Sequence, residues 1–318
     1  MSKIKLAIVS RDYKEYLSMF ECEAQLLQNY EVIYAGTDND SVKLRRVQNE
    51  SEVLISEPDI AAKFAHKCQS LLWIQSTWAG NNVLQKSDLK HIKVSGVKGI
   101  FAQRMSEYVL SYILYFHRKI EQYQNLKSKG VWQQLPIDIL SNKTLGIMGL
   151  GSIGKQVASA ANNLGMKVLG YSNSIKNITG VSEYIGDDLY AFTAKCDYLV
   201  NLLPETDTTI GMCDAKFFNH MKKNSIFINA GRGSIIDEPT SLIMAINKGF
   251  LSGAVLDVFE QEPLPQEHPY YLNPNIHITC HTAAVSEPTS VFEVFLENAQ
   301  RYTNNNELLY LHDFNKGY

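Results

Sequence analysis

The sequence predicts an α/β protein made of two doubly wound parallel-sheet domains. Short β-rich runs alternate with helical periodicity almost from end to end, which is typical of parallel sheets covered by helices. The 318 residues exceed the length at which a single core usually keeps growing, so two domains are expected. The alternation is interrupted once, near Gly99, and begins again at Thr144.

The first series of elements occupies the first third of the chain. Strands are expected at residues 4–9, 31–34, 53–55, 71–74 and 92–94, with helices between them. After Gly99 the pattern changes to an amphipathic helix over residues 105–120, long enough to bridge two domains, with Ser106 as a candidate cap. The first domain boundary is therefore expected near residue 100.

The second series contains six expected strands, at residues 144–148, 167–170, 198–202, 225–229, 253–257 and 276–279. Six strands suffice for a complete dinucleotide-binding fold. A last helix over residues 289–302 and a polar tail are expected to pack back on the first domain. The predicted domains are thus 1–100 with 285–318, and 101–284.

Composition and charge exclude several classes of protein. The net charge of −3 and the isoelectric point near 6.3 give no electrostatic footprint for nucleic acid. The five cysteines never form a C-x-x-C pair, so neither a disulfide framework nor a zinc site is indicated. His277 and His281 lie at the end of an expected strand rather than on a helix, and we reject them as a metal pair. With no signal peptide and no membrane-spanning run, a cytoplasmic enzyme acting on a small molecule is expected.

A glycine-rich motif, Gly149-Leu150-Gly151-Ser152-Ile153-Gly154, marks the expected dinucleotide site. The motif alone is a weak signal, but here it follows the strand TLGIM and opens an apolar helix over residues 153–164, the context that its mechanism requires. Gly149 makes the tight turn, Gly151 lets backbone N–H groups approach the pyrophosphate, and Gly154 lets the helix lie close to the strand. This predicts a Rossmann-type cofactor domain.

The end of the next strand bears on which dinucleotide is bound. Ser172 stands where a site specific for NAD usually carries Asp or Glu for the ribose 2′-hydroxyl. Ser172, Asn173, Ser174 and Lys176 offer hydroxyl, amide and cationic donors without a repelling carboxylate. That favours NADP. The alternative is that these are ordinary turn residues in a site of relaxed cofactor specificity, so NAD is also possible.

Three later segments offer a cation, an acid and an imidazole, each after a β-rich run. They are Ile228-Asn229-Ala230-Gly231-Arg232-Gly233, then Asp257-Val258-Phe259-Glu260-Gln261-Glu262-Pro263, then Thr279-Cys280-His281-Thr282-Ala283-Ala284. Parallel strands place such segments at one edge of the sheet, where α/β enzymes bind ligands. The set indicates an oxidoreductase that moves a hydride to or from a small oxyacid.

With these motifs in this order, the chain resembles the D-isomer-specific 2-hydroxyacid dehydrogenase family. The resemblance runs from Trp73-Ile74-Gln75-Ser76-Thr77-Trp78-Ala79-Gly80 through GLGSIG and Asn201-Leu202-Leu203-Pro204 to NAGRG, LDVFEQEPLP and the His281 motif. The MSEYVL helix, HTAAVSEP and the terminal Asn315-Lys316-Gly317-Tyr318 are most similar to its glyoxylate/hydroxypyruvate reductase branch. The resemblance implies a flavodoxin-like substrate domain beside the cofactor domain.

The resemblance implies catalytic roles that the residue chemistry also supports. Arg232 has a planar fork that binds a carboxylate bidentately and polarises the adjacent keto oxygen. His281 donates a proton to that oxygen during reduction. Glu262 would hold the far nitrogen of His281 and favour its imidazolium form. Glu262 is preferred to Glu260 because it precedes Pro263, as the catalytic acid of the family does.

The resemblance also implies the remaining contacts. Asp257 would contact the nicotinamide carboxamide, and backbone amides of Thr77, Trp78, Ala79 and Gly80 would bind the substrate carboxylate. Trp78 either lines or covers the pocket or packs within the first domain. Cys280 stands where proline is usual, and it either tunes the position of His281 or is incidental. Further cofactor contacts are expected from Ser152, Ile153, Leu203, Pro204 and Ala230. A homodimer through the cofactor domain is expected, with the helix YVLSYILYF either at the interface or in the core.

Two other classes of function stay open at this level. One is a phosphite- or formate-type dehydrogenase on the same scaffold. Glu262 counts against formate, because formate enzymes of this superfamily carry Gln there. The other is a dinucleotide-sensing protein similar to the corepressors that share the fold.

Overall fold

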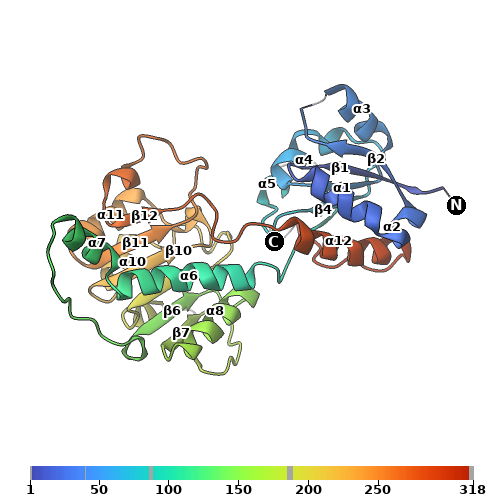
Figure 1. Cartoon of the computed structure of the whole chain (residues 1–318). Helices are drawn as coiled ribbons and strands as arrows, with labels where there is room; N and C mark the ends of the chain where they lie inside the picture. Colours follow the sequence, from blue (N-terminus) through green and yellow to red (C-terminus); the bar gives the residue numbers. More distant parts are fainter. Residues whose placement is uncertain (1, 40, 86–88, 185–188, 315–318) are drawn as a thin grey trace. The chain divides into compact units, whose positions relative to one another are not determined.

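The structure is a computed structural model that describes residues 2–39, 41–85, 89–184 and 189–314. The chain divides into two compact units. Unit 1 comprises Met1–Ile100 and Ser286–Tyr318, and unit 2 comprises Phe101–Val285. Both ends of the chain belong to unit 1 (Figure 1), which is therefore discontinuous in sequence.

Unit 1 contains a parallel sheet of five strands in the order β2-β1-β3-β4-β5. The strands are β1 (Ile4–Val9), β2 (Tyr30–Gly36), β3 (Val53–Ser56), β4 (Trp73–Ser76) and β5 (Lys93–Ser95). This is the flavodoxin-like order, in which the strand sequence reverses direction beside β1. The predicted fold of this half of the molecule is confirmed.

Helices cover both faces of this sheet because successive strand residues point to opposite sides. They are α1 (Tyr13–Cys22), α2 (Ala24–Asn29), α3 (Ser41–Glu50), α4 (Pro58–Phe64), α5 (Asn82–Gln85) and α12 (Pro288–Thr303). On one face, Ala7 and Val9 share a core with Ile60 and Phe64 of α4. On the other, the fully buried Trp73 stacks on Phe295 of α12, with ring centroids 5.6 Å apart. The last helix thus completes unit 1.

Unit 2 contains a parallel sheet of seven strands in the order β12-β11-β10-β9-β6-β7-β8. The strands are β6 (Thr144–Met148), β7 (Lys167–Tyr171), β8 (Val181–Tyr184), β9 (Tyr198–Asn201), β10 (Ser225–Asn229), β11 (Leu251–Leu256) and β12 (Ile276–Ile278). The six strands from β8 to β11 follow the Rossmann order, β12 extends the sheet beside β11, and the order reverses between β6 and β9. The predicted Rossmann-type fold is confirmed.

One strand of unit 2 was absent from the sequence prediction. β8 lies at the edge of the sheet, and none of its four residues is buried. An exposed edge strand needs no apolar alternation, so periodicity gives no signal for it. The expected count of six strands was therefore one too few.

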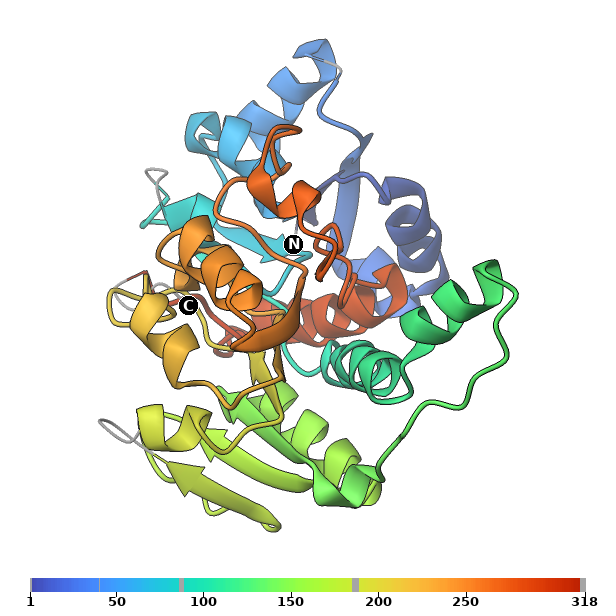
Figure 2. The same cartoon turned by 90° about the vertical axis from the view of Figure 1, so that its left-hand side faces the viewer.

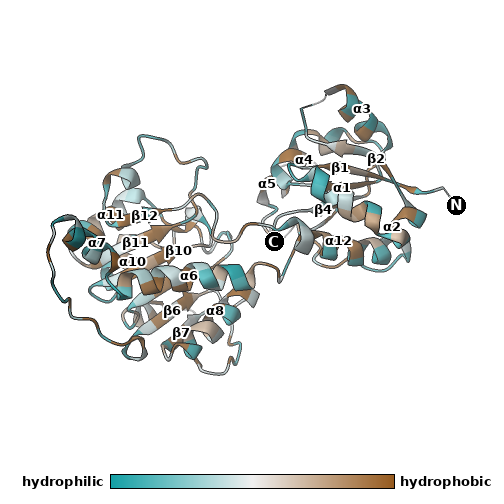
Figure 3. Cartoon of the chain, in the orientation of Figure 1, coloured by the Kyte–Doolittle hydropathy of each residue, from teal (hydrophilic) through white to brown (hydrophobic). Residues whose placement is uncertain are grey.

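The helices of unit 2 form two layers, one on each face of the sheet. They are α6 (Ala102–His117), α8 (Ser152–Asn163), α9 (Leu189–Thr193), α10 (Ala215–His220) and α11 (Pro239–Asn247), whereas α7 (Ile120–Ser128) has no buried residue and adds none to either core. Figure 2 shows the sheet between α6 and α8 (green) and the layer of α9 to α11 (yellow to orange), each with its own core. Figure 3 shows apolar residues concentrated on strands and hydrophilic residues on outer helix surfaces.

The helix expected over residues 105–120 is displaced in the structure. It begins at Ala102 and ends at His117, and Lys119 adopts a left-handed conformation with φ of 54° before α7 begins. The predicted cap at Ser106 is wrong. Ser106 is buried within α6, and its hydroxyl donates to the Ala102 carbonyl. Serine hydroxyls inside helices commonly form this hydrogen bond to the carbonyl four residues earlier. Among the described residues, no helix is long and apolar enough to span a membrane.

Candidate active site

The three chemistry-bearing segments follow three neighbouring strands of unit 2. Arg232 follows β10, Asp257 follows β11 directly, and His281 follows β12. These strands are adjacent and parallel in the sheet, so their carboxyl ends lie along one edge. The edge of an open α/β sheet where strands end is the usual place for a ligand site.

His281 and Glu262 are hydrogen-bonded, with 2.8 Å between His281 Nδ1 and Glu262 Oε2. The second oxygen of Glu262, Oε1, accepts the Phe259 amide at 2.9 Å, which fixes the carboxylate. An ionised carboxylate only accepts, so Nδ1 carries the proton and donates it. This leaves His281 Nε2 as the nitrogen that can exchange a proton with a ligand. Glu260 is exposed and makes no hydrogen bond or ion pair within the described chain.

The same contact shifts the pKa of each partner. The bond from Glu262 raises the pKa of His281 above 6.5, against the opposing effects of burial and of the Arg232 charge. Burial alone would raise the pKa of Glu262, but the bonds from His281 and the Phe259 amide outweigh it and lower that pKa below 4.5. The ion pair is therefore intact at pH values between the lowered pKa of Glu262 and the raised pKa of His281. Its contribution is lost as the pH rises through the pKa of His281 or falls through that of Glu262.

Arg232 is half-buried beside this pair. Its Nη1 donates to the Gly231 carbonyl at 2.7 Å, and no ion pair joins it to a carboxylate in the described part of the chain. Burial lowers the pKa of Arg232, opposed by the charges of Glu205 and Glu262. The group remains cationic, because guanidinium pKa values lie far above neutrality. Its fork can thus bind an incoming carboxylate.

Gly233 allows the Arg232 turn to lie against the Glu262 segment. A Cβ atom at Gly233 would stand 1.9 Å from the carbonyl carbon of Phe259, a backbone atom that cannot move aside alone. Only glycine permits this approach. The second glycine of NAGRG is therefore explained by packing between two loops that carry site residues.

Two buried asparagines, to which the sequence analysis assigned no role, support the same edge. Asn201 closes β9 and Asn229 closes β10, and their side chains are hydrogen-bonded at 2.8 Å. Asn201 accepts the Leu203 amide, and Asn229 donates to the Arg232 carbonyl at 3.0 Å. Both side chains are fully buried. The available signal was a polar residue at the end of an otherwise apolar strand.

Asp257 is buried, and its carboxylate binds the segment that carries His281. Oδ1 accepts the Thr282 amide at 2.8 Å and the Thr279 hydroxyl, and Oδ2 accepts the Ala283 amide at 3.0 Å. A carboxylate has about four acceptor positions, so Oδ2 keeps capacity for one more donor. Asp257 therefore fixes the backbone on either side of His281, a structural role in addition to the cofactor contact predicted for it.

The glycine motif forms the turn between β6 and α8, at the point where the strand order reverses. Gly149 has φ of 100°, a conformation that favours glycine, and a Cβ there would stand 2.9 Å from the Leu202 carbonyl oxygen. A Cβ atom at Gly154 would stand 2.1 Å from the Gly149 carbonyl oxygen, so the start of α8 packs closely on the turn and leaves no room for a side chain there. At Gly151 a Cβ would meet nothing within 4 Å. This open position before the amides of Ser152 and Ile153 fits the close approach of a pyrophosphate.

The glycine contacts predict opposite results for two alanine substitutions. Gly151→Ala should leave thermal stability unchanged, because its φ of −73° suits alanine and the methyl group meets no atom. The methyl group should block a charge-assisted bond of about 1.5–3 kcal/mol and weaken dinucleotide binding about 10- to 150-fold. Gly154→Ala should instead destabilise the fold by about 1–3 kcal/mol through overpacking. Thermal unfolding and dinucleotide titration check both. Equal loss of stability in the two variants would contradict this assignment.

The segment after β7 offers donors at its surface. Ser172 is buried and donates to the Ser174 carbonyl at 2.7 Å, whereas Asn173, Ser174 and Lys176 are exposed. Lys176 Nζ donates to the Ser174 hydroxyl at 2.7 Å. Glu183 of the following strand, β8, accepts the Lys176 and Ile178 amides of this loop. The loop therefore presents a lysine and hydroxyls.

The other expected cofactor residues lie along the same edge of unit 2. Leu203 and Pro204 follow β9, which neighbours β6 at the reversal of strand order, and Ala230 directly follows β10. Leu203 and Ala230 are buried, and Pro204 is exposed. Cys280 is exposed and free. His277 packs its ring against Tyr112, Tyr115 and Phe116.

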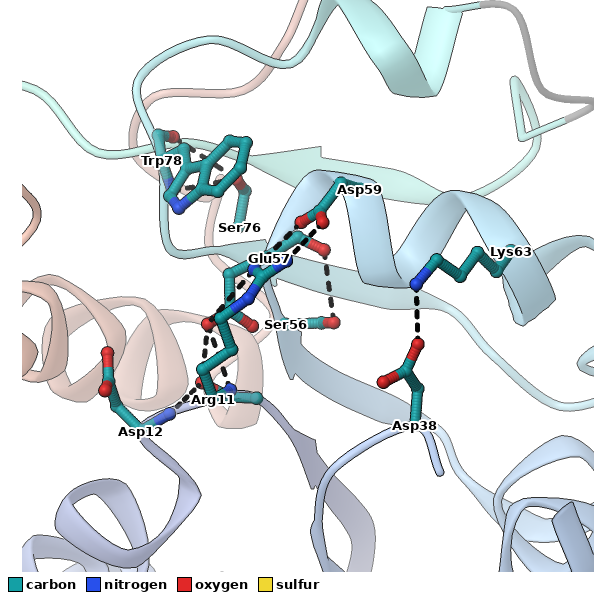
Figure 4. A network of polar contacts seen from close by, with 10 residues as sticks. Arg11, Asp12, Asp38, Ser56, Glu57, Asp59, Lys63, Ser76 and Trp78 are labelled. Carbon is teal, nitrogen blue, oxygen red and sulfur yellow. Dashed lines mark hydrogen bonds and ion pairs between the residues drawn. The ribbon is translucent and has the colours of Figure 1, made fainter. Parts of the chain in front are cut away.

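In unit 1, the expected substrate loop follows β4. Thr77 is buried, and its hydroxyl has no hydrogen-bond partner in the described structure, whereas Trp78 and Ala79 are exposed. The Ser76 hydroxyl accepts the Trp78 amide at 3.2 Å and shapes the turn that ends near Gly80. Figure 4 shows Trp78 beside Arg11, whose guanidinium carbon lies 6.0 Å from the ring centroid.

A second group of residues in unit 1 was missed by the sequence analysis. Arg11 follows β1, and it pairs with Asp59 and lies 3.9 Å from Glu57 (Figure 4). Glu57 is buried and accepts the Ser10 hydroxyl at 3.0 Å. Burial raises the pKa of Glu57 despite these bonds. This network links the ends of β1 and β3, next to the strand that carries the Trp78 loop.

Comparison with known proteins identifies the family. Residues 110–283 match the family model described as D-isomer specific 2-hydroxyacid dehydrogenase, NAD binding domain. The chain belongs to the D-isomer specific 2-hydroxyacid dehydrogenase family. The resemblance predicted from the motifs, including that to the glyoxylate/hydroxypyruvate reductase branch, is confirmed. The terminal motif 315–318 used in that prediction lies outside the described residues.

Three relatives in this family illustrate the similarity. A glyoxylate/hydroxypyruvate reductase A of Serratia proteamaculans is 38% identical over 62% of this chain and 63% of its own length. A family member from Aeromonas salmonicida has a TM-score of 0.92 at 35% identity, covering 98% of this chain and all of that one. An NADPH-dependent glyoxylate/hydroxypyruvate reductase of Sinorhizobium meliloti, solved with NADP and sulfate, has a TM-score of 0.87 at 29% identity, covering 99% and 100%. The match to the curated relative spans less than two thirds of that protein.

Proposed function

We propose that this protein reduces a small 2-oxo acid to the D-2-hydroxy acid with NADPH, and that glyoxylate or hydroxypyruvate is representative of its substrates. The observation that carries the proposal is the 2.8 Å bond between His281 and Glu262, beside a cationic Arg232 at the ligand edge of a dinucleotide fold. The names of the reductase relatives support the substrate class.

The chemistry divides among the residues of this edge. Arg232 binds the substrate carboxylate through its fork and polarises the adjacent keto oxygen. Bound NADPH supplies the hydride. His281 donates the proton from Nε2 to the developing alkoxide, and Glu262 stabilises the imidazolium through Nδ1. In the oxidative direction His281 accepts the proton back.

We propose that unit 2 binds the dinucleotide and unit 1 supplies substrate contacts. In unit 2, the cofactor contacts are assigned to the motif Gly149–Gly154, Ser172, Asn173, Ser174, Lys176, Leu203, Pro204, Ala230 and Asp257. Lys176 and the hydroxyl groups of its loop favour the 2′-phosphate of NADP, and the bond between Lys176 and Ser174 supports this. In unit 1, the backbone amides of Thr77 to Gly80 are assigned to the substrate carboxylate.

A panel of substrates tests the proposal. Nicotinamide absorbance is followed with NADPH and NADH in parallel, against glyoxylate, hydroxypyruvate, pyruvate and bulkier 2-oxo acids, with formate and phosphite assayed in the oxidative direction. The expected result is oxidation of NADPH in preference to NADH, with the small acids used best. Turnover of phosphite or formate alone, or tight dinucleotide binding without turnover of any compound, would contradict the proposal and favour the alternative classes.

The His281–Glu262 bond predicts how the reaction depends on pH. Reduction needs protonated His281, so activity falls as the pH rises through the pKa of His281, which Glu262 holds above 6.5. Glu262→Gln removes the anionic partner and lowers that pKa. The high-pH limb of the kcat/KM profile should therefore move toward acid. Glu260→Gln, in the same loop, is the matched control and should leave the profile in place. A profile unchanged by Glu262→Gln would remove Glu262 from the mechanism.

We further propose that the protein is a cytoplasmic homodimer that associates through unit 2. Within that unit, Val109 and Ile113 of α6 are part of the core, whereas Leu114, Ile120 and Trp132 are exposed, the last at 97%. The nearly complete exposure of the Trp132 side chain supports the assignment of the interface to this unit. Light scattering at several concentrations tests the dimer. All five cysteines are free, which suits a reducing compartment.

A further inference from the structure

The segment that carries His281 is held in a backbone conformation that is uncommon for residues other than glycine. His281 has φ of 55°, in the left-handed region that favours glycine. Residues other than glycine persist there only when their surroundings fix the backbone. The groups that hold this segment therefore decide where the imidazole lies.

Asp257 supplies most of these restraints. Its backbone carbonyl accepts the His281 amide at 2.8 Å. Its carboxylate accepts the amides of Thr282 and Ala283 and the hydroxyl of Thr279. One residue at the end of β11 thus binds the segment on both sides of His281.

A further contact extends this arrangement to α6. The hydroxyl of Tyr108 lies 2.8 Å from the hydroxyl of Thr279. Thr279 has one hydroxyl proton and donates it to Asp257, so it accepts from Tyr108. The direction of the chain of bonds is therefore fixed as Tyr108 to Thr279 to Asp257.

α6 is a firm support for such a contact. Val109, the next residue, and Ile113, one turn further, are fully buried in the core that α6 shares with α8. The ring of Tyr108 also packs on Tyr112, with centroids 5.0 Å apart. The hydroxyl is thus presented from an element that packing holds in place.

We propose that Tyr108 is a positioning residue, whose hydroxyl acts through Thr279 and the Asp257 carboxylate to hold the His281 segment in its reactive conformation. The proposal rests on the proposed function for its kinetic consequence, but not for its structural one. Among the described residues, no hydrogen bond or ring contact joins Tyr108 to His281 or Glu262. Tyr108 acts only through the two intermediate residues.

The first test is Tyr108→Phe, which removes the hydroxyl and keeps the ring, with Tyr112→Phe as matched control. Tyr112 lies on the same helix, and its hydroxyl makes no hydrogen bond among the described residues. Loss of one hydrogen bond should lower kcat about three- to tenfold in Tyr108→Phe, with dinucleotide affinity and thermal stability close to wild type. Tyr112→Phe should keep wild-type kcat. Equal behaviour of the two variants would overturn the proposal.

The second test is a double-mutant cycle with Thr279→Val. Because Tyr108 acts only through Thr279, Tyr108→Phe should add no further loss of kcat in the Thr279→Val background. Multiplying effects would show that Tyr108 acts by another route, which would overturn the proposal.

The third test needs no turnover and separates this proposal from the proposed function. The His281 ring is titrated by NMR in wild type and variants. The charged groups that act on it are Glu262, Asp257 and Arg232. If the segment loosens, His281 loses part of the contact with Glu262 and with the Asp257 charge, so its pKa should fall in Tyr108→Phe and not in Tyr112→Phe. An unchanged titration would overturn the positioning role, even in an active enzyme. A lowered pKa in a protein without turnover would sustain it and contradict the proposed function alone.

Discussion

His281→Asn is expected to lower kcat for 2-oxo acid reduction about 10²- to 10⁴-fold, the range that a positioned general acid contributes. Asparagine is chosen because it tolerates the left-handed conformation that residue 281 adopts, with φ of 55°. The amide keeps the backbone in place and cannot donate a proton as an imidazolium does. Dinucleotide affinity should stay close to wild type. Rapid-mixing kinetics and dinucleotide titration measure the two quantities.

The adjacent Cys280 provides the control for this substitution. Its side chain is exposed and free, and Cys280→Ala alters the same segment without touching the proton-transfer pair. It should keep kcat within about twofold of wild type, as surface changes usually do. If Cys280→Ala loses as much activity as His281→Asn, the loss reflects the segment and not the imidazole.

Arg232→Lys is the second substitution with a large expected effect. Lysine keeps the positive charge but lacks the planar fork that binds a carboxylate with two parallel bonds. Losing a donor that stabilises developing charge should lower kcat/KM for the 2-oxo acid about 10²- to 10³-fold. NADPH affinity should change little, because the dinucleotide contacts are assigned to other loops of unit 2. Steady-state kinetics with varied substrate and direct dinucleotide titration separate these effects. Equal loss of both would mean that Arg232 serves the cofactor.

Much of the fold could be predicted because its signals are local. The buried strands are short apolar runs, and the glycine motif after β6 marks the strand–turn–helix unit that opens a dinucleotide domain. The edge strand β8 escaped prediction because its residues are only partly buried or exposed. The start of α6 was not predicted correctly because its first turn, which includes Gln103 and Arg104, has no apolar periodicity.

The candidate site could be predicted where a residue type follows a strand end, as for Arg232 and His281, whereas Glu262 was preferred because it precedes Pro263 as the catalytic acid of the family does. The bond between His281 and Glu262 was expected from the resemblance, and the structure places the two side chains together. The supports of that site were not predictable. Asn201 and Asn229 meet only because β9 and β10 are neighbours in register, and Tyr108 lies 171 positions from Thr279. Such contacts depend on strand order and helix packing, which single-sequence patterns do not encode.

Hydride transfer is tested by a single turnover of hydroxypyruvate or pyruvate with NADPH deuterated at the transferable position of the nicotinamide. The deuterium is expected on the carbon bearing the new hydroxyl group, and the product is expected to be the D-isomer. In His281→Asn the same transfer should be slowed by the factor given above. Product of the L-configuration, or a hydroxy acid without deuterium, would contradict the account.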